Sequence, residues 1–463
     1  MASTQVDPAA LYPPHVTPPP KPLGFPHNLR KLIGNNLEAI PEEAYHGSLV
    51  LAPGPPRMAF IVDPDLIKTI LLDRFESFPK GRIQKEVLKP LFGNAMHAKE
   101  GAEWKWQRGA VAPLFRHNEL LQYGPAMTAV AEATLQAWRA TPPGAVRAIE
   151  NDMIHAAYEV ISKTILAGDT GGVAAAIEKG RSDYFNGVNW WVVYTILRLP
   201  NWVPRPGGRL MRAQEKRIRQ GVADLIKARR SSNGQDEDML SRWLGATDPG
   251  SGRKMSDEIL VDNIVSFVVS GFDTTALSLT WALYLLSQSP DWEARMLEEI
   301  ERVAGSEPIT ADDVPKLVVV QQVLNEAMRL YPAGPMIVRD IVEDMELGGK
   351  RLKAGTIGVI PIYALHRHRK HWNDPDRFDP ARFAPDADPK PSRYQFMPFG
   401  AGPRVCIGAA FSMLEATIML ATFVRAARFE ITPGFDPKPI AQMFLLPKNG
   451  MPMKVTMRDG GAQ

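Results

Sequence analysis

The amino-acid sequence predicts a mainly α-helical protein with small β-sheets, folded as a single large domain. Stretches with the helical spacing of apolar residues recur along most of the 463 residues, whereas strand-like stretches are short and scattered. From about Leu29 onwards, no long linker, internal repeat or low-complexity tract interrupts this series. We therefore expect residues 29–463 to form one domain.

The most apolar stretch, Ile259–Leu286, predicts a long helix from Asp257 to Leu286 that is buried through the centre of that domain. Ser256 comes before two acidic residues and is a typical N-cap. The stretch is long enough to span a membrane, but Asp262, Asn263 and Asp273 would each be costly in hydrocarbon. Other helices are expected at about 103–115, 127–138, 207–230, 314–330 and 407–427, and short strands at 58–62 and 356–360.

Residues 1–28 differ from the rest of the chain because they are rich in proline. Prolines cluster between positions 13 and 22 and predict an extended, polyproline-like arm. This segment lacks the basic and apolar regions of a signal peptide, and it has no apolar run long enough for a membrane anchor. We therefore expect a cytoplasmic protein without a membrane anchor.

The composition is that of a soluble globular protein, with 45% hydrophobic and 23% charged residues. The net charge of +3 is too small to indicate binding to nucleic acid, and no basic run interleaved with aromatic residues supports it. A single cysteine excludes an internal disulfide framework.

That cysteine, Cys406, lies in the loop Phe399–Gly408, FGAGPRVCIG. A lone cysteine is usually an inert buried residue. It cannot by itself form a structural zinc site or an iron–sulfur cluster, and the C-x-x-C-H pattern of covalent haem attachment is absent. A cysteine nucleophile needs a histidine beside it, which the sequence cannot place. One thiolate does suffice as the axial ligand of a haem iron.

The surroundings of the cysteine favour the haem ligand. Gly400, Gly402 and Gly408 remove side chains where a flat macrocycle must approach the backbone. Arg404 offers a cation for a haem propionate. Cys406 precedes an apolar helix, whose N-terminal dipole and free amides favour a thiolate over a thiol.

The loop resembles the haem-binding signature of the cytochrome P450 family, F-G-x-G-x-R-x-C-x-G, at every fixed position. The resemblance implies a triangular helical fold around a buried haem b, with Cys406 as the metal ligand. It also implies that four further residues of the loop border the cofactor: Phe399, Gly400, Arg404 and Gly408.

The central helix carries a second stretch, Ser270–Thr275 (SGFDTT), that resembles the family's oxygen-activation motif A/G-G-x-D/E-T-T/S. The resemblance implies that Asp273 and Thr274 deliver protons, and Gly271 is expected to let the helix open locally. The alternative is a polar kink in a buried helix, because threonine can bond the carbonyl four residues earlier. Ser270 departs from the usual alanine or glycine but is also small.

Two further stretches resemble the family's structural motifs. Glu326-Ala-Met-Arg329 matches E-x-x-R, whose spacing places both charges on one face of a helix. Pro380-Ala-Arg382-Phe383 is similar to P-E-R-F, with alanine in place of the glutamate. By resemblance, Glu326, Arg329 and Arg382 form a buried triad that supports the cysteine loop.

Trp104-Lys-Trp-Gln-Arg108 resembles the W-x-x-x-R of the helix that borders the haem. Trp104 and Arg108 lie one turn apart, so both can reach a propionate; the alternative is a cation–π pair on the surface. Arg339 occupies the place of another propionate ligand in the family.

The resemblance implies a monooxygenase that inserts one atom of O2 into a C–H bond of a hydrophobic small molecule, such as a fatty acid, a terpenoid or an aromatic compound. The electrons are expected from an external ferredoxin and its ferredoxin reductase, because the chain after Cys406 is too short for a flavin or ferredoxin domain. A peroxide-driven oxidase and a non-catalytic haem-binding sensor are the alternatives.

The same resemblance places the substrate pocket, and basic residues indicate where a partner could dock. Lys105 and Arg116 are candidates for docking an acidic partner. The basic tract His366–His371 is expected to be an ordinary solvated face, with partner contact as the less favoured interpretation. Lys80 or Arg82 could hold a substrate carboxylate. Residues expected to line the pocket are Phe267, Ser270, Met336, Ile337 and Phe444, with others near 78–92 and 186–191.

Overall fold

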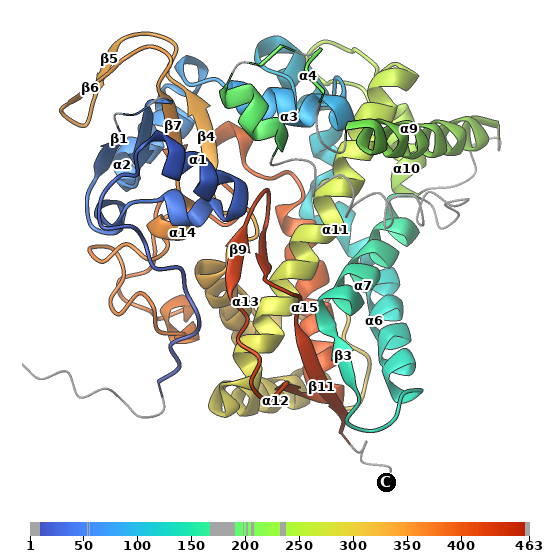
Figure 1. Ribbon diagram of the computed structural model, residues 1–463. Helices are drawn as coiled ribbons and strands as arrows, with labels where there is room; N and C mark the ends of the chain where they lie inside the picture. Colours follow the sequence, from blue (N-terminus) through green and yellow to red (C-terminus); the bar gives the residue numbers. More distant parts are fainter. Residues whose placement is uncertain are drawn as a thin grey trace, which may run out of the picture.

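The computed structural model describes residues 10–52, 54, 56–166, 190–197, 199–200, 202–204, 208–231 and 238–458. Helices dominate this part of the chain (Figure 1). The helices of the first half are α1 (Phe25–Gly34), α2 (Pro64–Lys68), α3 (Arg82–Phe92), α4 (Gly101–Val111), α5 (His117–Leu120), α6 (Gly124–Arg139), α7 (Ile149–Thr164) and α9 (Gly208–Ser231). Those of the second half are α10 (Met239–Gly245), α11 (Asp257–Ser287), α12 (Pro290–Ala304), α13 (Val318–Leu330), α14 (Ile362–Leu365) and α15 (Ala409–Ala426).

Within the described residues, four small sheets lie around these helices. The largest has the order β1-β2-β7-β4, formed by Leu49–Ala52, Met58–Ile61, Ile357–Ile360 and Ile337–Asp340. A three-stranded sheet has the order β3-β11-β8, formed by Val146–Ala148, Pro452–Met457 and Ala427–Ile431. Two pairs complete the set: β5 (Met345–Leu347) with β6 (Lys350–Leu352), and β9 (Pro439–Ala441) with β10 (Leu445–Pro447). The fold is mainly α with small β-sheets, as predicted.

The helix α11 runs through the middle of the molecule, and the other long helices pack around it (Figure 1). The Ser256 side chain caps its first turn by accepting the N–H of Ile259. In the described part of the chain, two helices are long and apolar enough by composition to cross a membrane, α11 and α15, and both are mostly buried inside the protein. A core helix of a soluble protein has the same properties.

The polar residues near the start of α11 are paired with neighbouring elements. The fully buried carboxylate of Asp262 binds the guanidinium of Arg219 on α9 at 2.5 Å and accepts the N–H of Asn94 at 2.6 Å. Asn263 accepts the N–H of Met96 and donates to the side chain of Gln107 on α4. These bonds fix α9 and the loop between α3 and α4 against α11, because an unpaired buried charge would be costly.

The proline-rich arm is bonded to the second half of the chain. The Val16 N–H donates to the hydroxyl of Tyr363 at 3.1 Å, and the Tyr331 hydroxyl donates to the carbonyl of Pro14 at 2.7 Å. The Tyr12 hydroxyl donates to the carboxylate of Asp374 on the surface. The arm therefore lies along α13 and α14 and the residues that follow them.

Removing the buried hydroxyl should destabilise the protein more than removing the exposed one. Tyr363→Phe leaves the buried N–H of Val16 without its acceptor, which costs about 1–3 kcal/mol. Tyr12→Phe removes a bond at a site 45% exposed and should change the free energy of unfolding by less than about 0.5 kcal/mol. Urea unfolding followed by circular dichroism measures both. Equal losses in the two variants would contradict this packing of the arm.

Candidate haem-thiolate site

The loop before α15 is held in a tight conformation by glycine. Gly402 has a φ of +73°, and a Cβ atom at this position would lie 1.9 Å from the carbonyl oxygen of Leu71. A side chain is therefore excluded there. The N–H of Gly400 donates to the carbonyl of Met397, and the N–H of Cys406 donates to the carbonyl of Phe399, each at 2.9 Å.

Cys406 combines exposure with a position deep inside the protein. Its side chain is accessible to water, yet burial raises the pKa of its thiol. A side chain that is accessible and yet has its pKa raised by burial is one that is surrounded by protein and faces an internal hollow. The N–H of Gly408 and the charge of Arg108 lower the pKa by smaller amounts. The amide at the helix terminus thus acts in the direction expected from the sequence, but its effect on the pKa is smaller than that of burial.

The central helix has one face that is not covered. Between positions 260 and 286 every residue of α11 is buried except Ser270, Gly271 and Thr274. Because the helix lies in the core and Gly271 packs against α7, Ser270 and Thr274 are the two that border an internal hollow. A hydrogen bond of 2.9 Å between the hydroxyls of Thr275 and Ser412 joins this part of α11 to the first turns of α15, which directly follow Cys406.

The helix α11 is continuous through the motif and does not open. The hydroxyl of Thr274 donates to the carbonyl of Ser270 at 3.0 Å, and Asp273 is fully buried. A Cβ atom on Gly271 would lie 2.6 Å from the side chain of Ile161 on α7. The glycine therefore permits the close packing of two helices, and the expectation of a locally opened helix is wrong.

Four cations gather beside the hollow, and among the described residues a single carboxylate, Glu100, acts on them. Arg404 lies with its guanidinium 4.6 Å over the ring of Trp104 and pairs with Glu100. Arg108 donates to the carbonyl of Val405 at 2.8 Å. The other two cations, Arg339 and Lys80, are nearly fully buried.

The pKa values of these cations report the crowding of positive charge. Burial and the charge of Arg404 lower the pKa of Lys80 to about 7 and that of Arg339 to about 10, although Glu100 acts in the opposite direction on both. Burial and Arg404 also lower the pKa of Arg108. The Nη1 atom of Arg404 is buried and finds no hydrogen-bond partner in the described part of the chain.

This arrangement fits a haem. A buried excess of positive charge with an orphaned donor needs anions, and the two propionates of a haem would supply them. The residues that would hold the propionates are Trp104, Arg108, Arg339 and Arg404, and Cys406 in the same region would hold the iron. Among the described residues, no group of three or more histidine, cysteine, aspartate or glutamate side chains could hold another metal.

The three residues of the predicted supporting triad lie together. Arg329 and Glu326 are fully buried, and the guanidinium donates to both carboxylate oxygens, at 2.6 and 2.8 Å. Arg382 lies 3.5 Å from the same carboxylate. Arg329 also donates to the carbonyls of His366, Pro375 and Arg377, at 2.7 to 3.0 Å.

The basic tract His366–His371 is a solvated face only in its second half, where Arg369 and Lys370 are exposed, so the expectation is wrong for the first half. His366, Arg367 and His368 are buried, at 0%, 3% and 2% exposure. His366 accepts the N–H of Met397 through Nε2, and Arg367 lies 3.9 Å over the ring of Tyr363. These side chains connect the segment after α14 to the cysteine loop, so they are not available to a redox partner.

The five named residues predicted to line a pocket differ in their exposure to solvent. Ser270, Met336, Ile337 and Phe444 are partly exposed. A Cβ atom on Gly400 would lie 3.6 Å from Ile337, and the N–H of Leu445 donates to the carbonyl of Ala333, so these segments meet near the cysteine loop.

Phe267 is buried and packs against Trp243 and Phe115, with ring centroids 4.6 and 5.3 Å apart. Residues 186–189 of the predicted lining lie outside the described residues.

Two residues near this cluster, Glu100 within it and the uncharged His97 beside it, were not predicted from the sequence, and Lys80 has other partners than the predicted substrate carboxylate. His97 and Glu100 stand alone in the loop before α4, and no motif marks them. Lys80 donates to the carbonyls of Met96, His97 and Lys99, at 3.1, 2.8 and 3.3 Å. Its burial could not be read from the sequence because its partners are backbone atoms.

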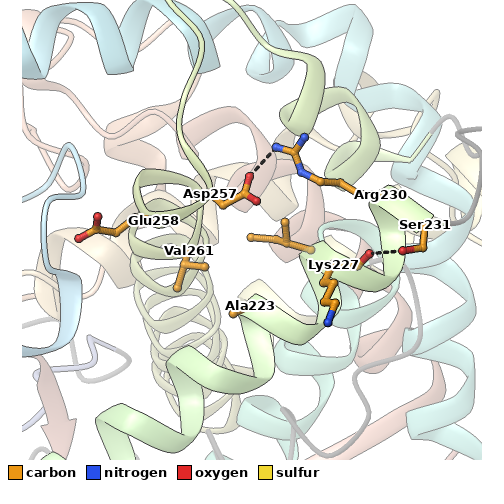
Figure 2. Close-up of a pocket in the computed structure, with 8 residues that line it drawn as sticks. Ala223, Lys227, Arg230, Ser231, Asp257, Glu258 and Val261 are labelled. Carbon is orange, nitrogen blue, oxygen red and sulfur yellow. Dashed lines mark hydrogen bonds and ion pairs between the residues drawn. The ribbon is translucent and has the colours of Figure 1, made fainter.

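A separate surface pocket of about 480 Å³ lies between α9 and the start of α11 (Figure 2). Figure 2 shows Arg230 reaching across it to the carboxylate of Asp257, at 2.5 Å. Its lining is formed by Ala223, Ile226, Lys227, Arg230, Ser231, Asp257, Glu258 and Val261. This pocket contains none of the predicted site residues.

A cysteine loop, a cluster of cations and an uncovered face of a central helix define a haem-binding oxidoreductase. The family profile of cytochrome P450 matches residues 19–455. The chain belongs to the cytochrome P450 family and is a monooxygenase of that family; its cofactor is a haem, and it uses O2 and a redox partner.

Curated relatives and a solved structure agree with this assignment. The chain is 30% identical to a pentalenene oxygenase from Streptomyces avermitilis, over 90% of this chain and 92% of the relative. It is also 30% identical to a cyclooctat-9-en-7-ol 5-monooxygenase from Streptomyces melanosporofaciens, over 84% of each. The crystal structure of the cytochrome P450DA heme domain has the same fold, with a TM-score of 0.80, 24% identity and coverage of 96% and 97%.

The buried triad should be far more sensitive to charge removal than an exposed pair. Glu326→Gln leaves the buried guanidinium of Arg329 without its counter-charge, which costs about 3–5 kcal/mol. The control Arg428→Gln removes an exposed partner of Glu430 and should cost less than about 1 kcal/mol. Urea unfolding of both variants checks the difference. Losses of similar size would mean that the triad does not support the fold.

Proposed function

We propose that this protein hydroxylates a hydrophobic small molecule in the cytoplasm, with haem b as its cofactor and with electrons from a ferredoxin and a ferredoxin reductase. Cys406 would be the iron ligand, and Asp273 and Thr274 would be the catalytic pair. The observation that carries the proposal is the position of Cys406, which faces an internal hollow close to the uncovered face of α11.

Each group of residues has one task in this proposal. Haem bound through a thiolate supplies the reductive activation of O2. Thr274, which is partly exposed, would deliver protons into the hollow, and the neighbouring Asp273 would resupply them from the buried side. Arg108, Arg339 and Arg404 would orient the cofactor through its propionates.

The redox partner would dock beside α4. Lys105 is exposed on this helix, one turn from Arg108, and Arg116 is exposed shortly after it. These cations are complementary to a small acidic ferredoxin.

The partly exposed residues Met336, Ile337 and Phe444 are apolar, which supports a hydrophobic substrate. The relatives named for pentalenene and cyclooctat-9-en-7-ol support a compound with a large carbon skeleton.

The first test is the carbon monoxide difference spectrum of the dithionite-reduced protein. The wild type should show the strongly red-shifted Soret band of thiolate ligation, and Cys406→Ser should lose it because the thiolate is replaced by a hydroxyl. Haem content of both samples, measured as the pyridine haemochrome, serves as the control. An unshifted band in intact wild-type protein would overturn the assignment of Cys406.

Thr274→Ala should uncouple the consumption of reductant from hydroxylation. Without the hydroxyl that delivers protons, we expect hydrogen peroxide released per NADPH to rise, and product per NADPH to fall by roughly tenfold or more. The measurement uses surrogate ferredoxin and reductase. Ser278→Ala, a buried serine one turn further along α11, is the control. Unchanged coupling in Thr274→Ala would favour a haem sensor or a peroxide-driven oxidase.

A further inference from the structure

A histidine that the mechanism does not use lies at one end of the uncovered face of α11. His97 belongs to the loop between α3 and α4, and its Nδ1 atom is hydrogen-bonded to the hydroxyl of Ser266 on α11. The rings of Phe92 and Phe267 pack against the imidazole, with centroids 5.8 and 6.3 Å away. Two aromatic rings and one hydrogen bond therefore fix the orientation of the ring.

The imidazole shares the side of α11 that borders the hollow. Ser266, Ser270 and Thr274 follow one another at intervals of four residues, so they lie along the same side of the helix. Ser270 and Thr274 are partly exposed, whereas Ser266 is fully buried beside His97. With a rise of 1.5 Å per residue, His97 lies about 12 Å along the helix from Thr274.

The imidazole is neutral, and one of its two ring nitrogens, Nε2, is available for a further hydrogen bond. Burial lowers the pKa of His97 to about 3, and the charges of Lys80 and Arg108 act in the same direction. A neutral imidazole has one N–H and one acceptor nitrogen. Nδ1 is engaged by Ser266, and within the described residues no hydrogen bond is made by Nε2. Part of the His97 surface is nevertheless exposed deep inside the protein.

We propose that His97, oriented by Ser266, binds a hydroxyl group on an otherwise apolar substrate. The proposal rests on the hydroxylase function proposed above and names the class of substrate: a hydrophobic alcohol. Its hydroxyl lies up to about 12 Å from the carbon that is oxidised beside Thr274. A hydroxyl both donates and accepts, so it pairs with Nε2 in either tautomer of the ring, whereas a carbonyl pairs only with the N–H form.

Matched ligand pairs test this proposal on the haem-loaded protein. Isothermal titration calorimetry gives the Kd of 1-octanol and of octane, and of cyclooctanol and of cyclooctane. The ratio of the alcohol Kd to the hydrocarbon Kd isolates the contribution of the hydroxyl. In His97→Leu this ratio should rise about tenfold or more, because the buried hydroxyl loses its partner. The hydrocarbon Kd should change less than about threefold, since leucine keeps the surface apolar.

Three further variants separate recognition from general damage. Ser266→Ala keeps the imidazole but loses its orientation, so it should raise the ratio by a smaller factor. His97→Gln, which retains a donor and an acceptor, should restore part of the preference. His117→Leu, on the exposed first residue of α5, should leave the ratio unchanged.

The proposal is overturned if the ratio in His97→Leu stays within twofold of the wild type, or if neither alcohol binds the wild type. Calorimetry does not depend on the ligand of the iron. The carbon monoxide spectrum of the same samples therefore shows separately whether the haem-thiolate assignment fails.

Discussion

The position of the cysteine loop depends on the buried guanidinium of Arg329. Its donors hold both oxygens of Glu326 and three backbone carbonyls between 366 and 377. His366, fixed in this way, accepts the N–H of Met397, and the carbonyl of Met397 accepts the N–H of Gly400 at the start of the cysteine loop. The loop is thus the last link of a chain of hydrogen bonds that begins on α13. A charge buried so completely tolerates few alternative arrangements, which makes the loop rigid.

The sequence was informative wherever a local pattern determines the structure. The central helix was predicted within one residue of its observed end, because its N-cap and its apolar run are both local. The cysteine loop was recognised because close backbone approach requires glycine at Gly402. The face of α11 that borders the hollow carries the motif residues Ser270 and Thr274, again from one short stretch.

The burial of residues that are covered by segments distant in the sequence could not be predicted. The tract His366–His371 has the sequence of a charged surface, yet half of it is covered by the arm, by α13 and by the cysteine loop. Lys80 and Glu100 meet through a backbone N–H, and His97 finds its partner Ser266 169 positions away. Single residues in loops carry no periodic signal, so their roles depend on tertiary contacts alone.

The docking of the proline-rich arm has a consequence for the order of synthesis. Val16 and its partner Tyr363 are separated by 347 positions, and Pro14 and Tyr331 by 317. The arm leaves the ribosome well before the surface that receives it, because both tyrosines are translated more than 300 residues later. Until then we expect the arm to remain extended, a conformation that its prolines favour because they already restrict the backbone. Closing this long loop is therefore among the last events of folding, after the helices around α11 have assembled.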